Sequence, residues 1–250
     1  MKSKHWILIT LLGMATPTFA SNDQTKDAPE QLDEQITHTQ LQDTIERAIT
    51  QFENTPREQW SYRISRYESE EDEISRRVEQ FTPGTETSER WSLLSINGAP
   101  PTEEQAREFV ASKLKKAKEN NGRSFSIFLR ELIQVETLQL QEVTKEVIRA
   151  EFQVYLSKLG EDVSESLRGT LLFNREQQFI DSIQITNKQA ISPVFGADID
   201  EFKLTFRFLK MNNSVLPLEH QLQMRGTWAL FKEIREVSTD TFSHYQYIGE

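Results

Sequence analysis

The stretch Phe202-Lys203-Leu204-Thr205-Phe206-Arg207-Phe208 places a large apolar side chain at every second position and a polar one between. Side chains of a β-strand point alternately to the two faces of a sheet, so this rhythm predicts a strand with one buried and one solvated face. A sheet with one polar face is typical of antiparallel topology. The segment therefore predicts a protein built mainly from antiparallel strands.

The same rhythm recurs on both sides of this stretch. Met211-Asn212-Asn213-Ser214 predicts a tight hairpin turn directly after it. Pro217, close behind, predicts an edge position or the start of a strand. Alternating or apolar runs predict roughly nine or ten strands in all, following one another from about residue 135 onward: 60–64, 74–81, 90–96, 148–156, 170–173, 179–187, 202–208, 215–224, 228–237 and 242–248.

Helical periodicity is confined to a few segments. One apolar stripe recurs every three to four residues from Leu41 to Phe52, which predicts a first helix. Thr102 and Gln105 form a capping-box pattern that opens a second helix within an insert at about 100–122. Residues 126–133 fit either a short helix or a strand, and a short third helix is favoured. Because so many strands in one sheet must curl, we expect an α+β, mainly β fold: a curved antiparallel sheet, or half-barrel, with helices packed on its concave side.

The first twenty residues have the layout of a cleavable signal peptide. Lys2 and Lys4 precede an apolar run from Trp6 to Met14, and Ala20 is a small residue at the expected cleavage point. The run is too short for a membrane-spanning helix, so no stable membrane anchor is expected. We expect a signal peptide at 1–20, a disordered leader at 21–36 and a single β-rich domain at 37–250, in the periplasm of a Gram-negative bacterium.

Charge and composition exclude several partners. Without Lys2 and Lys4 the chain has 27 basic and 39 acidic residues, a net charge of −12. An acidic surface repels phosphate backbones, so nucleic acid is not an expected partner. The chain contains no cysteine, and a domain of this size is expected to be stable through burial without disulfides.

The C-terminal half resembles the periplasmic outer-membrane lipoprotein carriers and their half-barrel relatives. The resemblance lies in the layout of Gly169-Thr170-Leu171-Leu172-Phe173, of 180–185, of Leu216-Pro217 leading into Arg225-Gly226-Thr227-Trp228, and of Lys232-Glu233-Ile234. It covers about residues 140–250 and contains no diagnostic motif, so no functional residue is carried over. The long insert at 100–122 and the acidic charge depart from those carriers. The resemblance implies a lipid- or lipoprotein-binding role.

Catalytic and metal motifs give no comparable signal. The sequence has no Gly-x-Ser-x-Gly elbow, no His-Glu-x-x-His and no glycine-rich phosphate loop, so we expect a non-enzymatic protein without a cofactor. The acidic run 68–73 lacks the spacing of a calcium loop and is interpreted as a solvated hairpin tip. His220 and His244 lie in predicted strands, yet no third ligand accompanies them, and no metal site is predicted.

Phenylalanine is the most informative excess in the composition. Of 15 Phe residues, 14 remain after the predicted cleavage, and many occupy inward strand positions. Most are expected to fill the core. A subset of aromatic residues is expected to line a cavity, because ligand pockets are mostly apolar with a few placed polar groups. The predicted cavity-lining residues are Trp60, Tyr62, Phe152, Phe206 and Trp228.

These observations lead to a hypothesis of function with two alternatives. The leading hypothesis is a non-enzymatic periplasmic binding or carrier protein that holds a lipid, an acyl chain or a lipoprotein in an apolar cavity. The first alternative is a cell-envelope protein-interaction module with a filled core and a protein partner. The second is an unrecognised hydrolase whose residues come from scattered strands.

Overall fold

The computed structural model describes residues 36–71, 73–84, 86, 89–119, 128–156, 159–229 and 232–249. The predicted signal peptide (1–20) and leader (21–36) lie outside the described residues, except for Ile36. The same holds for the end of the predicted helical insert and for the first two residues of the predicted short helix at 126–133.

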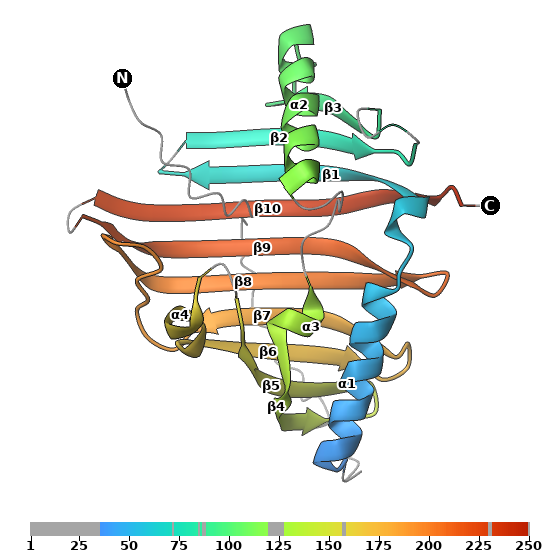
Figure 1. Ribbon diagram of the computed structural model, residues 1–250, viewed down its shortest axis with the longest axis vertical. Helices are drawn as coiled ribbons and strands as arrows, with labels where there is room; N and C mark the ends of the chain where they lie inside the picture. The colour runs from blue at the N-terminus through green and yellow to red at the C-terminus, as the bar shows by residue number, and fades with distance from the viewer. Residues whose placement is uncertain are drawn as a thin grey trace, which may run out of the picture.

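Ten strands form one antiparallel sheet in the order β3-β2-β1-β10-β9-β8-β7-β6-β5-β4 (Figure 1). Along the chain they are β1 (Trp60–Glu70), β2 (Glu73–Phe81), β3 (Trp91–Ile96), β4 (Ile133–Val143), β5 (Val147–Val154), β6 (Leu167–Asn174), β7 (Phe179–Asn187), β8 (Ala197–Met211), β9 (Ser214–Trp228) and β10 (Lys232–Tyr247). Strands that follow one another in sequence are neighbours in the sheet, except for β3 and β4, which form its two edges. The two ends of this series are joined by β10, which pairs with β1 as well as with β9.

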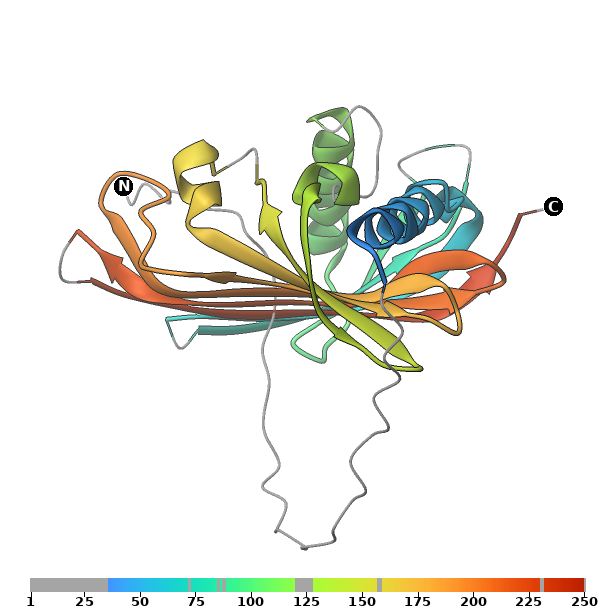
Figure 2. The same ribbon diagram turned by 90° about the horizontal axis from the view of Figure 1, so that it is seen from below.

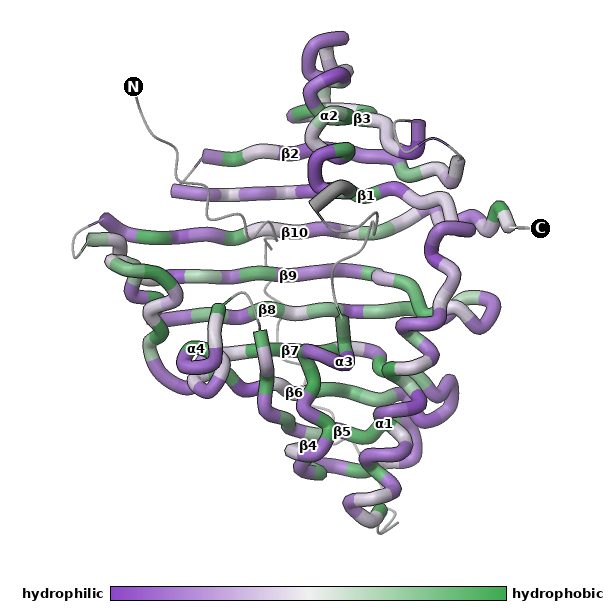
Figure 3. The backbone as a smooth tube through the Cα atoms, viewed as in Figure 1, coloured by the Kyte–Doolittle hydropathy of each residue, from purple (hydrophilic) through white to green (hydrophobic). Residues whose placement is uncertain are grey.

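One face of the sheet is apolar and the other is polar. Register pairing continues from Ala150 through Leu171, Ile183 and Phe206 to His220, which places these side chains in one row on the same face. The intervening positions, such as Lys203, are polar, and Figure 3 shows the alternation along the strands. The predicted alternation is confirmed, and so is the mainly β class with an antiparallel sheet.

The residues that the structure describes also form five helical segments, and the four α-helices among them lie on one side of the sheet (Figure 2). They are α1 (His38–Glu53), α2 (Glu103–Glu119), α3 (Leu129–Leu132) and α4 (Glu161–Glu165); a 3-10 turn, η1 (Arg57–Gln59), leads into β1.

Helix α1 is positioned by its apolar stripe. A capping box between Thr37 and Gln40 starts the helix. Its buried residues are Leu41, Ile45, Ala48, Ile49 and Phe52, all members of the main hydrophobic core with residues of β4 to β9. The Phe52 ring meets the Phe208 ring of β8 edge-on, with centroids 4.9 Å apart. Burial of this stripe against the apolar face holds α1 on the half of the sheet that ends at β4.

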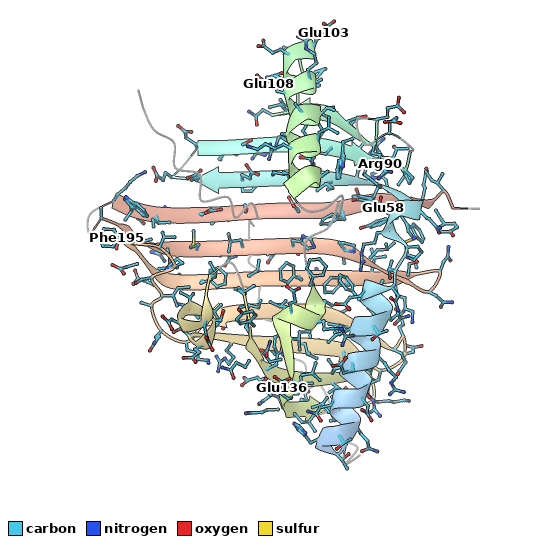
Figure 4. The ribbon with its side chains drawn as sticks, in the orientation of Figure 1. Glu58, Arg90, Glu103, Glu108, Glu136 and Phe195 are labelled. Atoms are coloured by element: carbon cyan, nitrogen blue, oxygen red, sulfur yellow. The ribbon has the colours of Figure 1, made fainter. Side chains whose placement is uncertain are left out.

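Helix α2 lies on the opposite half of the sheet, next to β3. The predicted capping box is present: Gln105 N donates to Thr102 Oγ1, and Thr102 N donates to Gln105 Oε1. Phe109 is the buried apolar residue of the helix, while Glu103 and Glu108 point to solvent (Figure 4). With so little apolar burial, α2 depends on polar contacts for its position.

The turn between β8 and β9 follows its sequence. Met211 pairs with Ser214, and Asn212 and Asn213 have φ angles of 47° and 64°, as the predicted tight turn requires. Pro217 was expected either on an edge strand or at the start of a strand. It lies near the start of β9, which is an internal strand. The last pair of β9 with β10 is Glu219 with Thr241, so Pro217 lies beyond that ladder and its missing N–H costs no bond there.

Candidate functional site

Two of the five predicted cavity residues, Trp60 and Tyr62, lie in an aromatic cluster where β1 meets β10. The Tyr62 ring stacks on Phe81 at 5.0 Å and lies 5.5 Å from the Tyr245 ring. Trp60 meets Tyr247 edge-on at 5.3 Å, and Trp60 Nε1 donates to Ser214 Oγ at 3.3 Å. The rings pack against one another and leave a void of about 10 Å³ bounded by Trp60, Tyr62 and Tyr245. That volume is at the lower limit for one water molecule.

The other three predicted residues lie elsewhere. Phe206 is buried in β8 and packs against His220, with centroids 5.2 Å apart. The Phe152 ring covers Gly169 on β6, so that a Cβ atom at Gly169 would lie 2.2 Å from it. Trp228 is 36% exposed at the end of β9. The structure therefore does not bring the five together in one place, and contact of any of them with a ligand stays a prediction.

A groove opens at another position, between the start of α1 and the edge strand β4. Its origin is a bulge in β4. Gln134 pairs with Gln153 and Gln139 pairs with Glu151, so five steps along β4 match only two along β5. The four residues 135–138 lie opposite Phe152 alone, which is three more than a regular ladder allows, and they bend away from the ladder. Bulges are over-represented at sheet edges and next to functional sites, where they redirect side chains.

Side chains replace the ladder hydrogen bonds that the bulge removes. Thr137 Oγ1 accepts from Gln153 N at 2.8 Å and donates to Gln134 O at 2.6 Å. From α1, the His38 ring nitrogen Nε2 lies 3.0 Å from Leu138 O, and Gln42 Nε2 donates to Val135 O at 3.4 Å. The bulge is thus fixed in place and does not behave as a loose loop.

The groove has a volume of about 550 Å³, within the range of small-molecule sites. Its walls come from Ile36, His38 and Leu41 on one side, 136–140 of β4 on the other, and Gln153 of β5. The floor is apolar, because Leu41 and Leu138 are each 1% exposed. The rim is polar, with Glu136 at the edge of the sheet (Figure 4). Such a groove suits a molecule with an apolar body and a polar end.

A buried ionic cluster lies at the other half of the same face, beneath α2. Arg66 of β1 donates to two carboxylates, Glu79 of β2 at 2.8 Å and Asp240 of β10. Lys113 of α2 donates to the second oxygen of Glu79 at 2.6 Å, and its Nζ lies 3.9 Å from the centre of the Trp91 ring. This cluster supplies the polar contacts that α2 needs to stay on the sheet.

The pKa values in the cluster follow from the number of partners. Burial opposes ionisation of Glu79, but Arg66 and Lys113 together outweigh it and lower its pKa. Asp240 has only Arg66 as a hydrogen-bonded cation, and there burial prevails and raises the pKa to about 6. Burial also lowers the pKa of Lys113 to about 8, against the pull of Glu79. The cluster is held by opposite charges and shows no nucleophile beside a base.

The two histidines considered as metal ligands in the sequence, His220 and His244, lie in different surroundings. Burial lowers the pKa of His220 to about 3, so the ring is neutral among Phe206 and Phe242. His244 is exposed and contacts Ser243. Within the described part of the chain, no group of three or more potential ligands could hold a metal ion. The run 68–73 lies at the β1–β2 hairpin, where Glu70 pairs with Glu73, as the predicted tip requires.

The sequence interpretation missed both the groove and the ionic cluster. A signal for the cluster was present, since Arg66 follows Ile64 by two positions and Glu79 precedes Phe81 by two, on the inward phase of each strand. The groove had no comparable signal, because it depends on a pairing shift between two strands.

No helix among the described residues has the length and apolar character needed to cross a membrane.

Comparison with known proteins gives little further information. No protein-family model matches the chain, and no curated protein matches it. Among solved structures, a DUF1329 family protein from Desulfovibrio piger ATCC 29098 is similar at 10% sequence identity, over 82% of this chain and 91% of that chain, with a TM-score of 0.33. A TM-score this low does not establish a common fold. The comparisons indicate no catalytic family for this chain.

Proposed function

We propose that this protein is a non-enzymatic binding or carrier protein of the cell envelope and that it holds the acyl chain of a lipid or lipoprotein in the groove between α1 and β4. One observation carries the proposal: the bulge in β4 opens an apolar-floored groove of about 550 Å³ at the margin of the core. The predicted export signal and the resemblance to half-barrel lipoprotein carriers, in which helices cover a curved sheet, support the same function.

The groove explains how an amphiphile would be held. An acyl chain would lie against Leu41 and Leu138, and each buried CH₂ group is worth about 0.8 kcal/mol. The polar end would remain at the rim beside His38 and Gln153, where hydrogen-bonding groups meet solvent.

The test is titration of the purified protein with a fluorescent fatty-acid probe, together with solvent extraction of any co-purified lipid. Leu140 lies on the groove and is 40% exposed, so Leu140→Glu adds a charge to the site without opening the core. We expect at least a tenfold rise in the probe Kd. Leu94 is the matched control: it is 39% exposed on β3, the opposite edge strand, and Leu94→Glu is expected to leave the Kd unchanged.

Two results contradict the proposal: absence of saturable binding together with absence of extracted lipid, or equal effects of the two substitutions.

A second candidate function is an envelope protein-interaction module. It is favoured by the packed rings around Trp60 and Tyr62, which leave a void of only about 10 Å³. A stoichiometric protein partner recovered from envelope extract, with no lipid bound, would support that function instead.

A further inference from the structure

One end of the sheet exposes large apolar side chains that the groove does not involve. Phe195, in the loop between β7 and β8, is fully exposed at 101%, and Val194 beside it is 42% exposed. Figure 4 places Phe195 at the end of the long strands, away from α1. A Phe side chain presents roughly 150–250 Å² of apolar surface. Exposure of the whole ring gives the folded chain no packing energy, so its position calls for a reason outside the fold.

The loop that carries Phe195 has a fixed conformation. Ile191 and Ile199 exchange two backbone hydrogen bonds of 2.9 and 2.8 Å at its base. Ala197 N donates to Val194 O at 3.1 Å, which closes a turn at the tip. Gly196 has a φ of +86°, a value that favours glycine. The turn therefore presents the Phe195 ring to solvent in a fixed position.

A second aromatic residue lies next to this tip. Trp228, 36% exposed, pairs with Ala197 across β9 and β8. The following residue, Ala229, donates its N–H to Gly196 O at 2.7 Å and so joins the two loops. Val194, Phe195 and Trp228 are thus three exposed apolar residues at this end of the sheet, where the two loops are joined, here called the aromatic tip.

We propose that the aromatic tip is a contact surface for the interface of a phospholipid bilayer. A protein partner would need a surface shaped to receive these side chains. A bilayer accepts any projecting apolar group. The wholly apolar ring of Phe195 suits the acyl-chain region of the bilayer. The ring of Trp228 suits the head-group region, because Trp combines an apolar ring with an N–H donor.

The charges around the tip favour insertion without electrostatic attraction. Residues 192–196 contain no charged side chain. Asp198 accepts from Ser192 Oγ at 2.7 Å, and Lys232, opposite Trp228, is bound to Glu71 at 2.7 Å. The chain as a whole has a net charge of −10, which repels anionic lipid. The expected target is therefore a bilayer of neutral, zwitterionic phospholipid.

The experiment is co-sedimentation of residues 21–250, the chain without its predicted signal peptide, with phosphatidylcholine vesicles. We expect binding that changes little when salt rises from about 0.1 M to about 1 M, since screening affects charges and not apolar insertion. Phe195→Ser is expected to lower the partition coefficient by about tenfold or more. The matched control is Met211→Ser at the opposite end of β8, which is 38% exposed and is expected to have no effect.

Three outcomes overturn the proposal: no binding of the unmodified chain to any vesicle, equal binding by Phe195→Ser, or binding that needs anionic lipid and disappears in high salt. Loss of self-association in Phe195→Ser, seen by light scattering without vesicle binding, would assign the surface to a second copy and also overturn it. The fatty-acid titration of Phe195→Ser separates this inference from the proposed function, because the groove lies elsewhere and probe binding is expected to be unchanged.

Discussion

Helix α2 is attached to the sheet mainly through one buried ion pair, which makes the pair a sensitive test of the structure. The Glu79 side chain is 2% exposed and the Lys113 side chain 17% exposed. Glu79→Gln leaves two buried cations, Arg66 and Lys113, with one fewer carboxylate. Removal of one partner from a buried ion pair costs about 3–5 kcal/mol, so we expect a loss of that size in the free energy of unfolding.

Lys113→Met is expected to cost less. The Met side chain keeps the apolar contacts with Trp91 and Phe109, and Glu79 keeps Arg66 as a partner. We expect a loss of about 1.5–3 kcal/mol in the free energy of unfolding, the size of a hydrogen bond to a charged group. In the Glu79→Gln background Lys113 has lost its counter-ion, so the same change is expected to cost nothing or to stabilise. The coupling energy of the pair is then about 2 kcal/mol.

The assay is urea unfolding at neutral pH, followed by tryptophan fluorescence, for the two single variants and the double variant. The control is Glu103 and Arg107 on the same helix, an i,i+4 pair with side chains 95% and 73% exposed. A coupling below about 0.5 kcal/mol is expected there. If the losses at Glu79 and Lys113 add to within about 0.5 kcal/mol, the pair does not hold α2, and the reasoning is refuted.

Two further predictions concern the sheet itself. Burial, reinforced by Glu70, raises the pKa of Glu236 from 4.5 to about 8. The folded state therefore binds this proton more tightly than the unfolded state does. The free energy of unfolding then falls as the pH rises from about 4.5 to about 8. Glu236→Gln is expected to flatten that decline in urea midpoints measured at several pH values, and an unchanged slope would contradict the assignment. A Cβ atom at Gly226 would lie 2.1 Å from a backbone oxygen, so Gly226→Ala is expected to lower Tm by about 4 °C or more. The control is Gly84→Ala. A Cβ atom there would have a side-chain carbon at 3.9 Å as its nearest neighbour, so Tm is expected to be unchanged. Equal Tm values for the two variants in a thermal melt would show that the backbone yields at Gly226.

The strands and the first helix could be predicted because their signals are local. Alternation in 202–208 depends only on which face each side chain occupies, and the stripe of α1 depends only on helical geometry. The turn at Asn212 and Asn213 was equally local, since these residues tolerate positive φ. In each case the residues that determine the local structure lie within a few positions of one another in the sequence.

The site could not be predicted in the same way, because it depends on pairing between distant segments. Trp60 and Tyr62 were expected to face a cavity, yet neighbouring rings from β2 and β10 fill that space. No sequence pattern within β4 predicts its bulge, because the bulge is a shift in the pairing register between β4 and β5. Trp228 has the inward phase of its strand, but the strand ends there and its ring reaches solvent.

The pairing of β10 with β1 has a consequence for how the chain assembles. Residue pairs from Trp60 with Tyr247 to Glu70 with Glu236 join segments near opposite ends of the polypeptide. The strand β10, which comes after the other nine along the described chain, is therefore an interior strand, and without it the sheet consists of two blocks, β1–β3 and β4–β9. Each block then presents an unpaired edge at β1 or β9, where another chain could add a strand. Loss of the final segment would divide the molecule and would not merely shorten it.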